Sequence, residues 1–391
     1  MQQKDTSAMS NVLNKSVAIQ GTLPFQQATA PKSNQIEYAN ISLNNAFAKK
    51  KDEFYTQYED VEKEMSLHEE VFVSKNVFCN CDDPYESAFF KFFVLNFNRL
   101  GLSTLSSTCY TGFPKLRGSY LIGENKNAYK AVVNKVVDET ILLPDGSINW
   151  KELFKTADNR IELLSGNGDF RSNECIELLK SCDIVATNPP FSLFREYVRL
   201  LQKHNKQFII LGNMNAATTR EIFPLFKNNQ VWYGDSIRSG DRKFFVPNNY
   251  PLNAACCGID KDGQRFIRVK GVRWFTNIKF SSPAKRLKLK KLYNEAEYPY
   301  YDNYDAIEVC RTLNIPLDYK GIMGVPITFL DKYCPEQFEI IMLANGNART
   351  NVSKQTLSKV KYIKHPKDKG GVCMLNGKRV YARILIRNRF T

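Results

Sequence analysis

A nine-residue segment in the middle of the chain fixes where one strand must end. Residues 183–191 read Asp-Ile-Val-Ala-Thr-Asn-Pro-Pro-Phe. Proline lacks a backbone N–H and holds φ near −65°, so an apolar strand over 183–187 cannot continue through two consecutive prolines. The pattern therefore predicts a buried strand that runs directly into a loop, Asn188-Pro189-Pro190-Phe191, called here the NPPF loop.

Strand-like and helix-like segments alternate around this loop. The expected strands are 71–81, 102–110, 161–164, 183–187 and 208–211, and the expected helices are 57–70, 86–100, 172–180 and 192–204. Such alternation predicts an α/β fold with a parallel, doubly wound sheet of Rossmann type. Ligands of these sheets bind beyond the carboxyl ends of the strands. Asp82, Asp169 and Asn188 all follow predicted strands, which makes them candidates for one site.

The NPPF loop has the composition needed to activate an exocyclic amino nitrogen. The N6 amine of adenine is a weak nucleophile because its lone pair is delocalised into the ring. Two acceptors aimed at its hydrogens, the Asn188 side-chain oxygen and the Pro189 carbonyl, free that lone pair. Pro190 holds the carbonyl in place, and Phe191 offers the base a face for stacking. The alternative is that the two prolines only terminate the strand.

Methyl transfer to such an amine implies S-adenosylmethionine as the donor. Residues that bind this cofactor are expected directly after the other strands. Asp169 is placed to accept from the adenine amine of the cofactor, and Phe170 to cover that ring. Asp82 or Asp83 can bind the ammonium of the methionine moiety, although Asp83 is nearly as well suited to cap the following helix. No glycine-rich loop follows the first strand, and no acidic ribose ligand follows the second, which ends Ser-Ser-Thr-Cys-Tyr at Tyr110.

The charge of the chain is unevenly distributed. Residues 1–230 contain 26 Lys and Arg and 26 Asp and Glu, so the whole formal charge of +15 lies in residues 231–391. This favours a catalytic core followed by a region that binds a polyanion. The expected DNA-contacting residues lie in the tract 283–293 and in the last dozen residues: Lys285, Arg286, Lys288, Lys290, Lys291, Arg383 and Arg387. The alternative for the tract, whose basic residues alternate with leucines, is a solvated face over a packed apolar one.

The composition of the chain gives no sign of a metal site, a disulfide framework or a membrane segment. Ten cysteines without a Cys-x-x-Cys pair and only three histidines give no zinc set, so we expect reduced thiols and no metal. No apolar run reaches the roughly 18 residues needed to span a bilayer, and the N-terminus lacks the pattern of a signal peptide. We expect a monomeric, cytoplasmic, DNA-associated protein, nuclear if the source is eukaryotic. The expected organisation is a disordered extension over 1–48, a methyltransferase core over 49–280, and a target-recognition region over 281–391.

Several longer segments resemble the EcoRI-type adenine-specific DNA methyltransferase family. The resemblance rests on 52–58 (DEFYTQY), 79–84 (CNCDDP), 168–172 (GDFRS), 188–194 (NPPFSLF), 301–306 (YDNYDA) and 324–330 (GVPITFL). It covers roughly 50–340 and the last dozen residues, leaving 1–48 and 343–376 as additions.

This resemblance implies a class I S-adenosylmethionine-dependent fold and transfer to N6 of an adenine rotated out of duplex DNA. It implies that Tyr55 and Thr56 belong to the N-terminal cofactor motif, that the turn Cys81-Asp82-Asp83-Pro84 binds the cofactor without glycines, and that Asn188 borders the cofactor. A GAATTC-like site is the default target. Three alternatives stay open on the residues alone: an RNA adenine-N6 methyltransferase with the same core, a protein glutamine methyltransferase, and an inactive nucleic-acid-binding relative.

Overall fold

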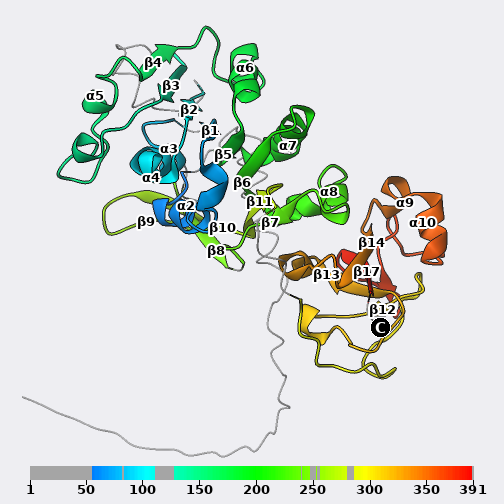
Figure 1. The fold of residues 1–391 in the computed structure, drawn as a ribbon. Coiled ribbons are helices and arrows are strands. Elements are labelled where there is room, and N and C mark those ends of the chain that lie inside the picture. The colour runs from blue at the N-terminus through cyan, green and yellow to red at the C-terminus, as the bar shows by residue number, and fades with distance from the viewer. Residues whose placement is uncertain are drawn as a thin grey trace, which may run out of the picture.

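The structure, a computed structural model, describes residues 55–81, 83–110, 127–238, 240–246, 252, 256–279 and 286–389. These residues form a core unit, 55–279, and a C-terminal unit, 286–389, which Figure 1 shows side by side. The extension expected over 1–48 lies outside the described residues, as do Asp82 and Lys285. In the part that the structure describes, no helix is both long and apolar enough to cross a membrane.

The core unit is built on an eight-stranded sheet with the order β4-β3-β2-β1-β5-β6-β11-β7. Its strands are β1 (Asn76–Cys79), β2 (Thr104–Thr108), β3 (Tyr129–Val133), β4 (Arg160–Leu163), β5 (Ile184–Thr187), β6 (Gln207–Asn213), β7 (Trp232–Tyr233) and β11 (Val272–Thr276). Only β2, β1, β5 and β6 pair in parallel. The β3 and β11 strands are antiparallel to both of their neighbours. The fully parallel sheet expected from the alternation was therefore wrong, and the sheet is mixed.

The direction of β3 and β11 follows from where the chain enters each strand. Helices α3 (Ala88–Leu95) and α4 (Phe97–Leu100) return the chain from β1 to β2, and α7 (Phe194–Lys203) returns it from β5 to β6, as parallel pairs require. By contrast, β11 begins after Gly271, whose carbonyl accepts from Met214 N just past the end of β6 (2.6 Å). The chain therefore enters β11 at the carboxyl edge and must run back along β6.

Alternate residues of each central strand face opposite layers of helices. On β1, Val77 and Cys79 belong to the hydrophobic cluster under α2 (Tyr58–Met65), α3 and α4. Phe78 points the other way, into the cluster under α6 (Asn173–Ser181), α7 and α8 (Phe223–Lys227). The first predicted strand, 71–81, is shorter than expected because a 3₁₀ turn, η1 (Glu69–Phe72), occupies its start.

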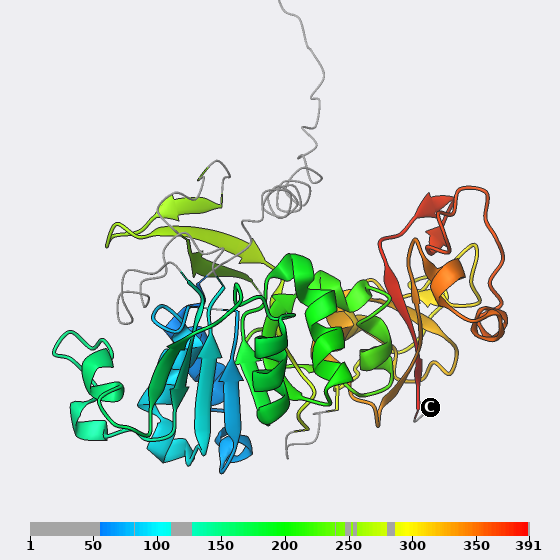
Figure 2. The same cartoon turned by 90° about the horizontal axis from the view of Figure 1, so that it is seen from above.

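A second, three-stranded sheet covers one end of the core sheet. It consists of β8 (Asp241–Phe245), β10 (Arg265–Lys270) and β9 (Cys257–Ile259), paired antiparallel in the order β8-β10-β9 and called here the small sheet. Phe244, Ile267 and Val269 on its inner face join the same cluster as α2 and α3. Figure 2 shows the small sheet, in yellow-green, lying across one end of the core strands.

The C-terminal unit contains a four-stranded sheet in the order β12-β13-β17-β14 and a hairpin. Its elements are β12 (Ile307–Glu308), β13 (Met323–Pro326), β14 (Phe338–Ala344), β17 (Arg383–Asn388), α9 (Ala348–Asn351), α10 (Lys354–Lys359) and the hairpin strands β15 (Met374–Leu375) and β16 (Lys378–Arg379).

The remaining short helices of the two units are α5 (Trp150–Leu153) and the 3₁₀ segments η3 (Asp138–Thr140), η4 (Phe191–Leu193), η5 (Met214–Thr218), η6 (Thr312–Asn314) and η7 (Ile327–Lys332).

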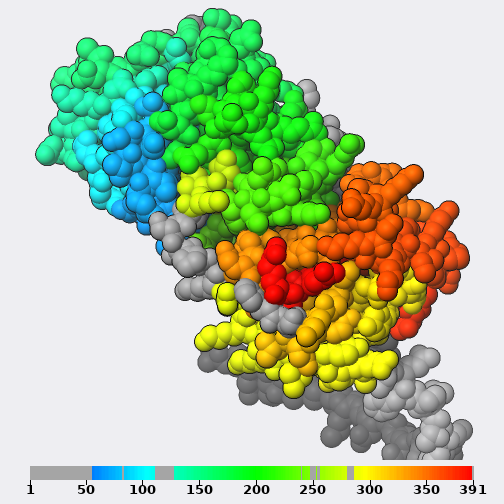
Figure 3. Space-filling model, turned by 45° about the vertical axis from the view of Figure 1, so that its right-hand side comes forward, coloured from blue at the N-terminus to red at the C-terminus, as the bar shows by residue number. Residues whose placement is uncertain are grey.

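The two units share one hydrophobic cluster. Phe226 of α8 lies in the same buried cluster as Val325 of β13 and Ile384 of β17. An ion pair buried at this junction joins Arg273 of β11 to Asp331 of η7, with Nε–Oδ1 2.7 Å. Figure 3 shows the yellow-to-red C-terminal unit packed against the green segments of the core unit.

Candidate active site at the carboxyl edge of the core sheet

The start of the NPPF loop is tied to the turn that follows β1. The Thr187 hydroxyl, at the end of β5, donates to the backbone carbonyl of Asn80. The Tyr197 hydroxyl, from α7, donates to the Asn80 side-chain oxygen. Burial raises the pKa of the Tyr197 phenol well above its usual value, so it stays protonated as a donor. Two side-chain contacts thus hold the carboxyl ends of β1 and β5 together. The sequence predicted that these ends lie at one edge, but it did not predict the two contacts.

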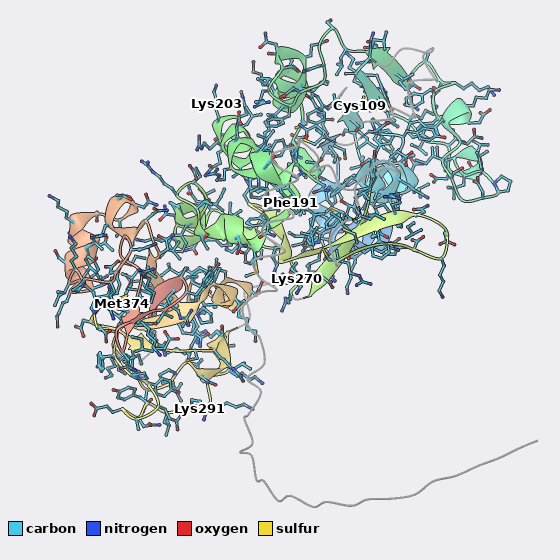
Figure 4. All side chains as sticks on the ribbon, turned by 180° about the vertical axis from the view of Figure 1, so that it is seen from behind. Cys109, Phe191, Lys203, Lys270, Lys291 and Met374 are labelled. Carbon is cyan, nitrogen blue, oxygen red and sulfur yellow. The ribbon has the colours of Figure 1, made fainter. Side chains whose placement is uncertain are left out.

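The NPPF loop itself presents a nearly buried amide. Asn188 is only 6% exposed. The carbonyl of Pro190 is engaged within the loop, where it accepts from Leu193 N at 2.9 Å. Phe191 starts η4, and its ring lies edge-on to that of Phe244 in the small sheet, with 6.3 Å between ring centroids. Figure 4 shows Phe191 near the middle of the molecule.

The small sheet also brings the N-terminal segment to this edge. Tyr55 pairs with Phe245 of β8 through two backbone hydrogen bonds, Tyr55 N to Phe245 O (3.0 Å) and Phe245 N to Tyr55 O (3.1 Å). Thr56 is buried, and its hydroxyl has no hydrogen-bond partner among the described residues. A buried hydroxyl in this state suits a group that receives a ligand. The sequence did not predict the part played by β8, because its residues carry no recognisable motif.

The turn after β1 is made without glycine. Cys81 takes up a left-handed backbone conformation, with φ +76°, which is uncommon for a residue with a side chain. Asp83 is fully buried, and its carboxylate accepts from the Tyr129 hydroxyl and from Tyr85 N (3.0 Å). Helix α3 is capped by Ser87, which accepts from Phe90 N, so the N-cap role considered for Asp83 was wrong. Pro84 is buried in the same turn.

The second predicted cofactor group, Asp169 and Phe170, lies in a tightly constrained loop. Gly168 has φ +73°, and a Cβ at this position would overlap the carbonyl of Cys109, so only glycine fits. The Asp169 carboxylate holds Arg171 through two bonds, Nε–Oδ1 2.8 Å and Nη2–Oδ2 2.6 Å, and this guanidinium lowers the pKa of Asp169. Phe170 is buried.

Phe170 connects the two halves of the candidate site. Its ring meets that of Tyr197 edge-on at 5.1 Å, and the Arg171 guanidinium lies 5.2 Å from its centroid. A continuous set of contacts therefore runs from Asp169 through Phe170, Tyr197 and Asn80 to the residue before Asn188. The expected clustering of cofactor-binding and NPPF residues at one edge matches this geometry, while their individual roles stay predictions. Within the described ranges, no three His, Cys, Asp or Glu side chains are grouped to hold a metal ion.

The predicted DNA-binding residues fall into two groups. Arg286, Lys288, Lys290 and Lys291 are exposed, while Leu287 and Leu289 between them pack against the hydrophobic cluster shared by the two units. This arrangement agrees with a solvated face over a packed one and leaves the basic side chains accessible. Arg383 is different: its guanidinium is paired with the buried carboxylate of Glu308, with Nη2–Oε1 2.8 Å. The Nε of Arg387 is buried as well.

The exposed tract supports a quantitative prediction. Replacing Lys288, Lys290 and Lys291 with Gln should flatten the dependence of log DNA affinity on log salt by about two to three units if each lysine contacts a phosphate. DNA affinity should fall equally for all sequences, and cofactor affinity should stay the same. Titrations of duplex DNA at several salt concentrations measure the slope. An unaltered slope would mean that the tract serves only as a solvated face.

Comparison with known proteins identifies the class. The chain matches the family described as adenine-specific methyltransferase EcoRI over residues 42–389. It is 42% identical to the type II methyltransferase M.EcoRI of Escherichia coli, over 90% of this chain and 97% of that protein. It is 40% identical to the type II methyltransferase M.MpnI of Mycoplasma pneumoniae, over 89% of this chain and 98% of that protein. No solved structure is a significant match.

The chain therefore belongs to the EcoRI family of adenine-specific methyltransferases, which confirms the resemblance found in the sequence. It is an enzyme that methylates adenine in DNA. The match runs through 343–376, a stretch that the sequence resemblance had left out.

Proposed function

We propose that the enzyme transfers a methyl group from S-adenosylmethionine to N6 of an adenine rotated out of duplex DNA, at the NPPF loop. The observation that supports this most directly is the position of Asn188, nearly buried and tied through Thr187 to the turn after β1. When bound, S-adenosylmethionine would supply a methyl carbon on a positively charged sulfur. The N6 lone pair would bond to that carbon as the carbon–sulfur bond breaks, the neutral thioether would leave, and the nitrogen would release one proton to solvent, with no covalent enzyme intermediate. The proposed fold class is that of class I methyltransferases, with residues 281–391 as the target-recognition region.

Three residues of the loop have separate tasks in this proposal. The Asn188 side-chain oxygen and the Pro189 carbonyl accept the two N6 hydrogens, which concentrates the lone pair on nitrogen. Phe191 stacks on the base and is supported from behind by Phe244. Holding the base in this position removes much of the entropic cost of the reaction.

The cofactor is proposed to lie along the same edge, against Tyr55 and Thr56, the turn Cys81–Pro84, and the Asp169–Phe170 loop. The open Thr56 hydroxyl fits such a ligand, as does Asp169, whose oxygens can accept from an adenine amine beside Arg171. The enzyme is proposed to act as a monomer on duplex DNA. A GAATTC-like sequence is the proposed target, by the family alone.

Incubation with cofactor labelled in its methyl group tests the proposal. Label should enter duplex DNA and be recovered as N6-methyladenine after digestion, with little transfer to an RNA duplex of the same sequence. Sequencing of methylated positions in DNA from expressing cells would then give the target. Label confined to RNA, or found in another base, would refute the proposed substrate.

Asp169→Ala should weaken cofactor binding by about 1–3 kcal/mol, the usual cost of losing a buried hydrogen bond. Isothermal titration with S-adenosylmethionine, without DNA, measures this directly. Asp145→Ala, at an exposed loop position, serves as the matched control and should bind the cofactor as the parent does. Equal affinities for the parent and the Asp169 variant would remove Asp169 from the cofactor site.

A further inference from the structure

The C-terminal unit carries a surface on which almost every charge is positive. Between residues 346 and 381 the sequence has nine Lys and Arg and a single acidic residue, Asp368. Five of the basic residues lie on the loop 362–371 and the β15–β16 hairpin, called here the basic loop–hairpin surface. They are exposed: Lys364, Lys367, Lys369, Lys378 and Arg379.

The one acidic side chain of this stretch is turned inward. Asp368 is 9% exposed, and its carboxylate accepts from the Tyr362 hydroxyl and from Gly371 N (2.5 Å). It therefore organises the loop and cannot pair with the lysines around it. Two neighbouring lysines outside the surface are paired, Lys359 with Glu339 and Lys361 with Asp305. Among the described residues, the five members of the surface form no ion pair, in contrast to these two lysines.

Backbone contacts hold the surface in one shape. A Cβ at Gly370, where φ is +70°, would overlap the carbonyl of Gly346, so loop and neighbouring chain are closely fitted. Asn376 and Gly377 both have positive φ, as a tight type I′ hairpin requires, and their N–H groups donate to the Asp302 carboxylate. Arg379 Nε donates to the Lys367 carbonyl at 2.8 Å, which joins the hairpin to the loop.

The surface is shaped as well as charged. Lys367, Gly377, Lys378 and Arg379 border a shallow depression that is open to solvent. In Figure 2 the red hairpin rises on the same side of the molecule as the yellow-green small sheet that covers the candidate active site. In Figure 4, Met374 of the hairpin lies apart from Lys291 of the tract, so the two basic regions are separate.

We propose that the basic loop–hairpin surface binds backbone phosphates of the duplex DNA and holds the target-recognition region in register on it. The inference rests on the proposed function, because it takes the substrate to be duplex DNA. The five exposed cations outnumber the two acids beside them, the buried Asp368 and the Asp302 carboxylate that holds the hairpin. Such an array favours phosphate contacts, because ordering its side chains costs little when the backbone is already fixed. Phosphate contacts of this kind position a protein and carry no sequence information.

Two variants of the full-length enzyme test the proposal: Lys364→Gln/Lys367→Gln/Lys369→Gln in the loop and Lys378→Gln/Arg379→Gln in the hairpin. A control variant removes three charges from exposed positions of the core unit, Lys135→Gln/Lys151→Gln/Lys203→Gln. For each protein, affinity for a duplex is measured across a range of salt concentrations, together with cofactor affinity and the melting temperature.

The loop variant should flatten the salt slope by about two to three units and the hairpin variant by about one to two, at nearly 0.9 units per contact. Cofactor affinity and melting temperature should match the parent, and the control should keep the parent slope. Parent slopes in both variants would overturn the proposal. A parent enzyme that binds duplex DNA with the expected slopes but transfers no methyl group to adenine would instead refute the proposed function.

Discussion

Asn188→Ala should lower turnover at least roughly a hundredfold while changing DNA affinity little. Loss of a single preorganised acceptor or donor at a reacting group typically has an effect of this size. On the proposed roles, the remaining Pro189 carbonyl would accept only one of the two N6 hydrogens, and the lone pair would stay delocalised into the ring. Single-turnover methylation of a saturating duplex isolates this effect from binding and product release.

Asn228→Ala, at an exposed position after α8, is the matched control and should turn over as the parent does. If the Asn188 variant stayed within a few-fold of the parent, the asparagine would only shape the loop. Activation of the amine would then have to come from the loop backbone.

Arg383→Ala should destabilise the protein by about 3–5 kcal/mol, the range for removing one partner of a buried ion pair. The Arg383 side chain is 13% exposed and that of Glu308 is 2%, and the Tyr301 hydroxyl donates to the same carboxylate. Without the guanidinium, the Glu308 charge is left in the interior of the C-terminal sheet. Denaturant unfolding of parent and variant measures the loss.

The double variant Glu308→Gln/Arg383→Met should be less destabilised than Arg383→Ala, because it leaves no buried charge without its partner. Lys378→Ala, on the exposed hairpin nearby, should change the free energy of unfolding by no more than about 0.5 kcal/mol. Parent-like stability of Arg383→Ala together with weaker DNA binding would restore the phosphate contact predicted for Arg383 from the sequence.

Local patterns predicted the elements that carry the candidate site. The strand 183–187 and the helix after it were recognisable because two prolines end one and an amphipathic pattern defines the other. The observed elements are β5, Ile184–Thr187, and α7, Phe194–Lys203. Asp169 and Asn188 could be assigned to one edge because polar residues that follow strands of like direction lie at the same edge of a sheet. Three strands nevertheless separate β4 from β5.

Such local patterns do not predict which strands or side chains pair when they lie far apart in the sequence. The five residues of β11 are all buried, and Val272, Trp274 and Phe275 among them favour a strand without indicating its direction. That direction depends on the small sheet, which returns the chain to the carboxyl edge. Likewise, Arg383 in a basic terminal segment looks like a DNA contact until the fold places it beside Glu308, 75 residues away in the sequence.

The sequence did not predict the basic loop–hairpin surface, for a related reason. Its five cations are spread over residues 364–379 and interrupted by an acid, whereas the tract at 283–293 is more compact and has no acid. Only the fold shows that Asp368 is turned inward and that the hairpin joins the loop.

The hydrophobic cluster shared by the two units bears on how enzymes of this kind diversify. Phe226 of α8 and Val325 of β13 lie in one cluster, and Lys227 donates to the Ile341 carbonyl across the junction at 2.7 Å. A C-terminal unit taken from a differently packed relative would leave this cluster mismatched at many positions at once. The loss in free energy of unfolding would be comparable to the whole stability of a domain. New target specificities should therefore arise by stepwise replacement of exposed side chains on an inherited frame, and not by recombination that shuffles intact recognition modules.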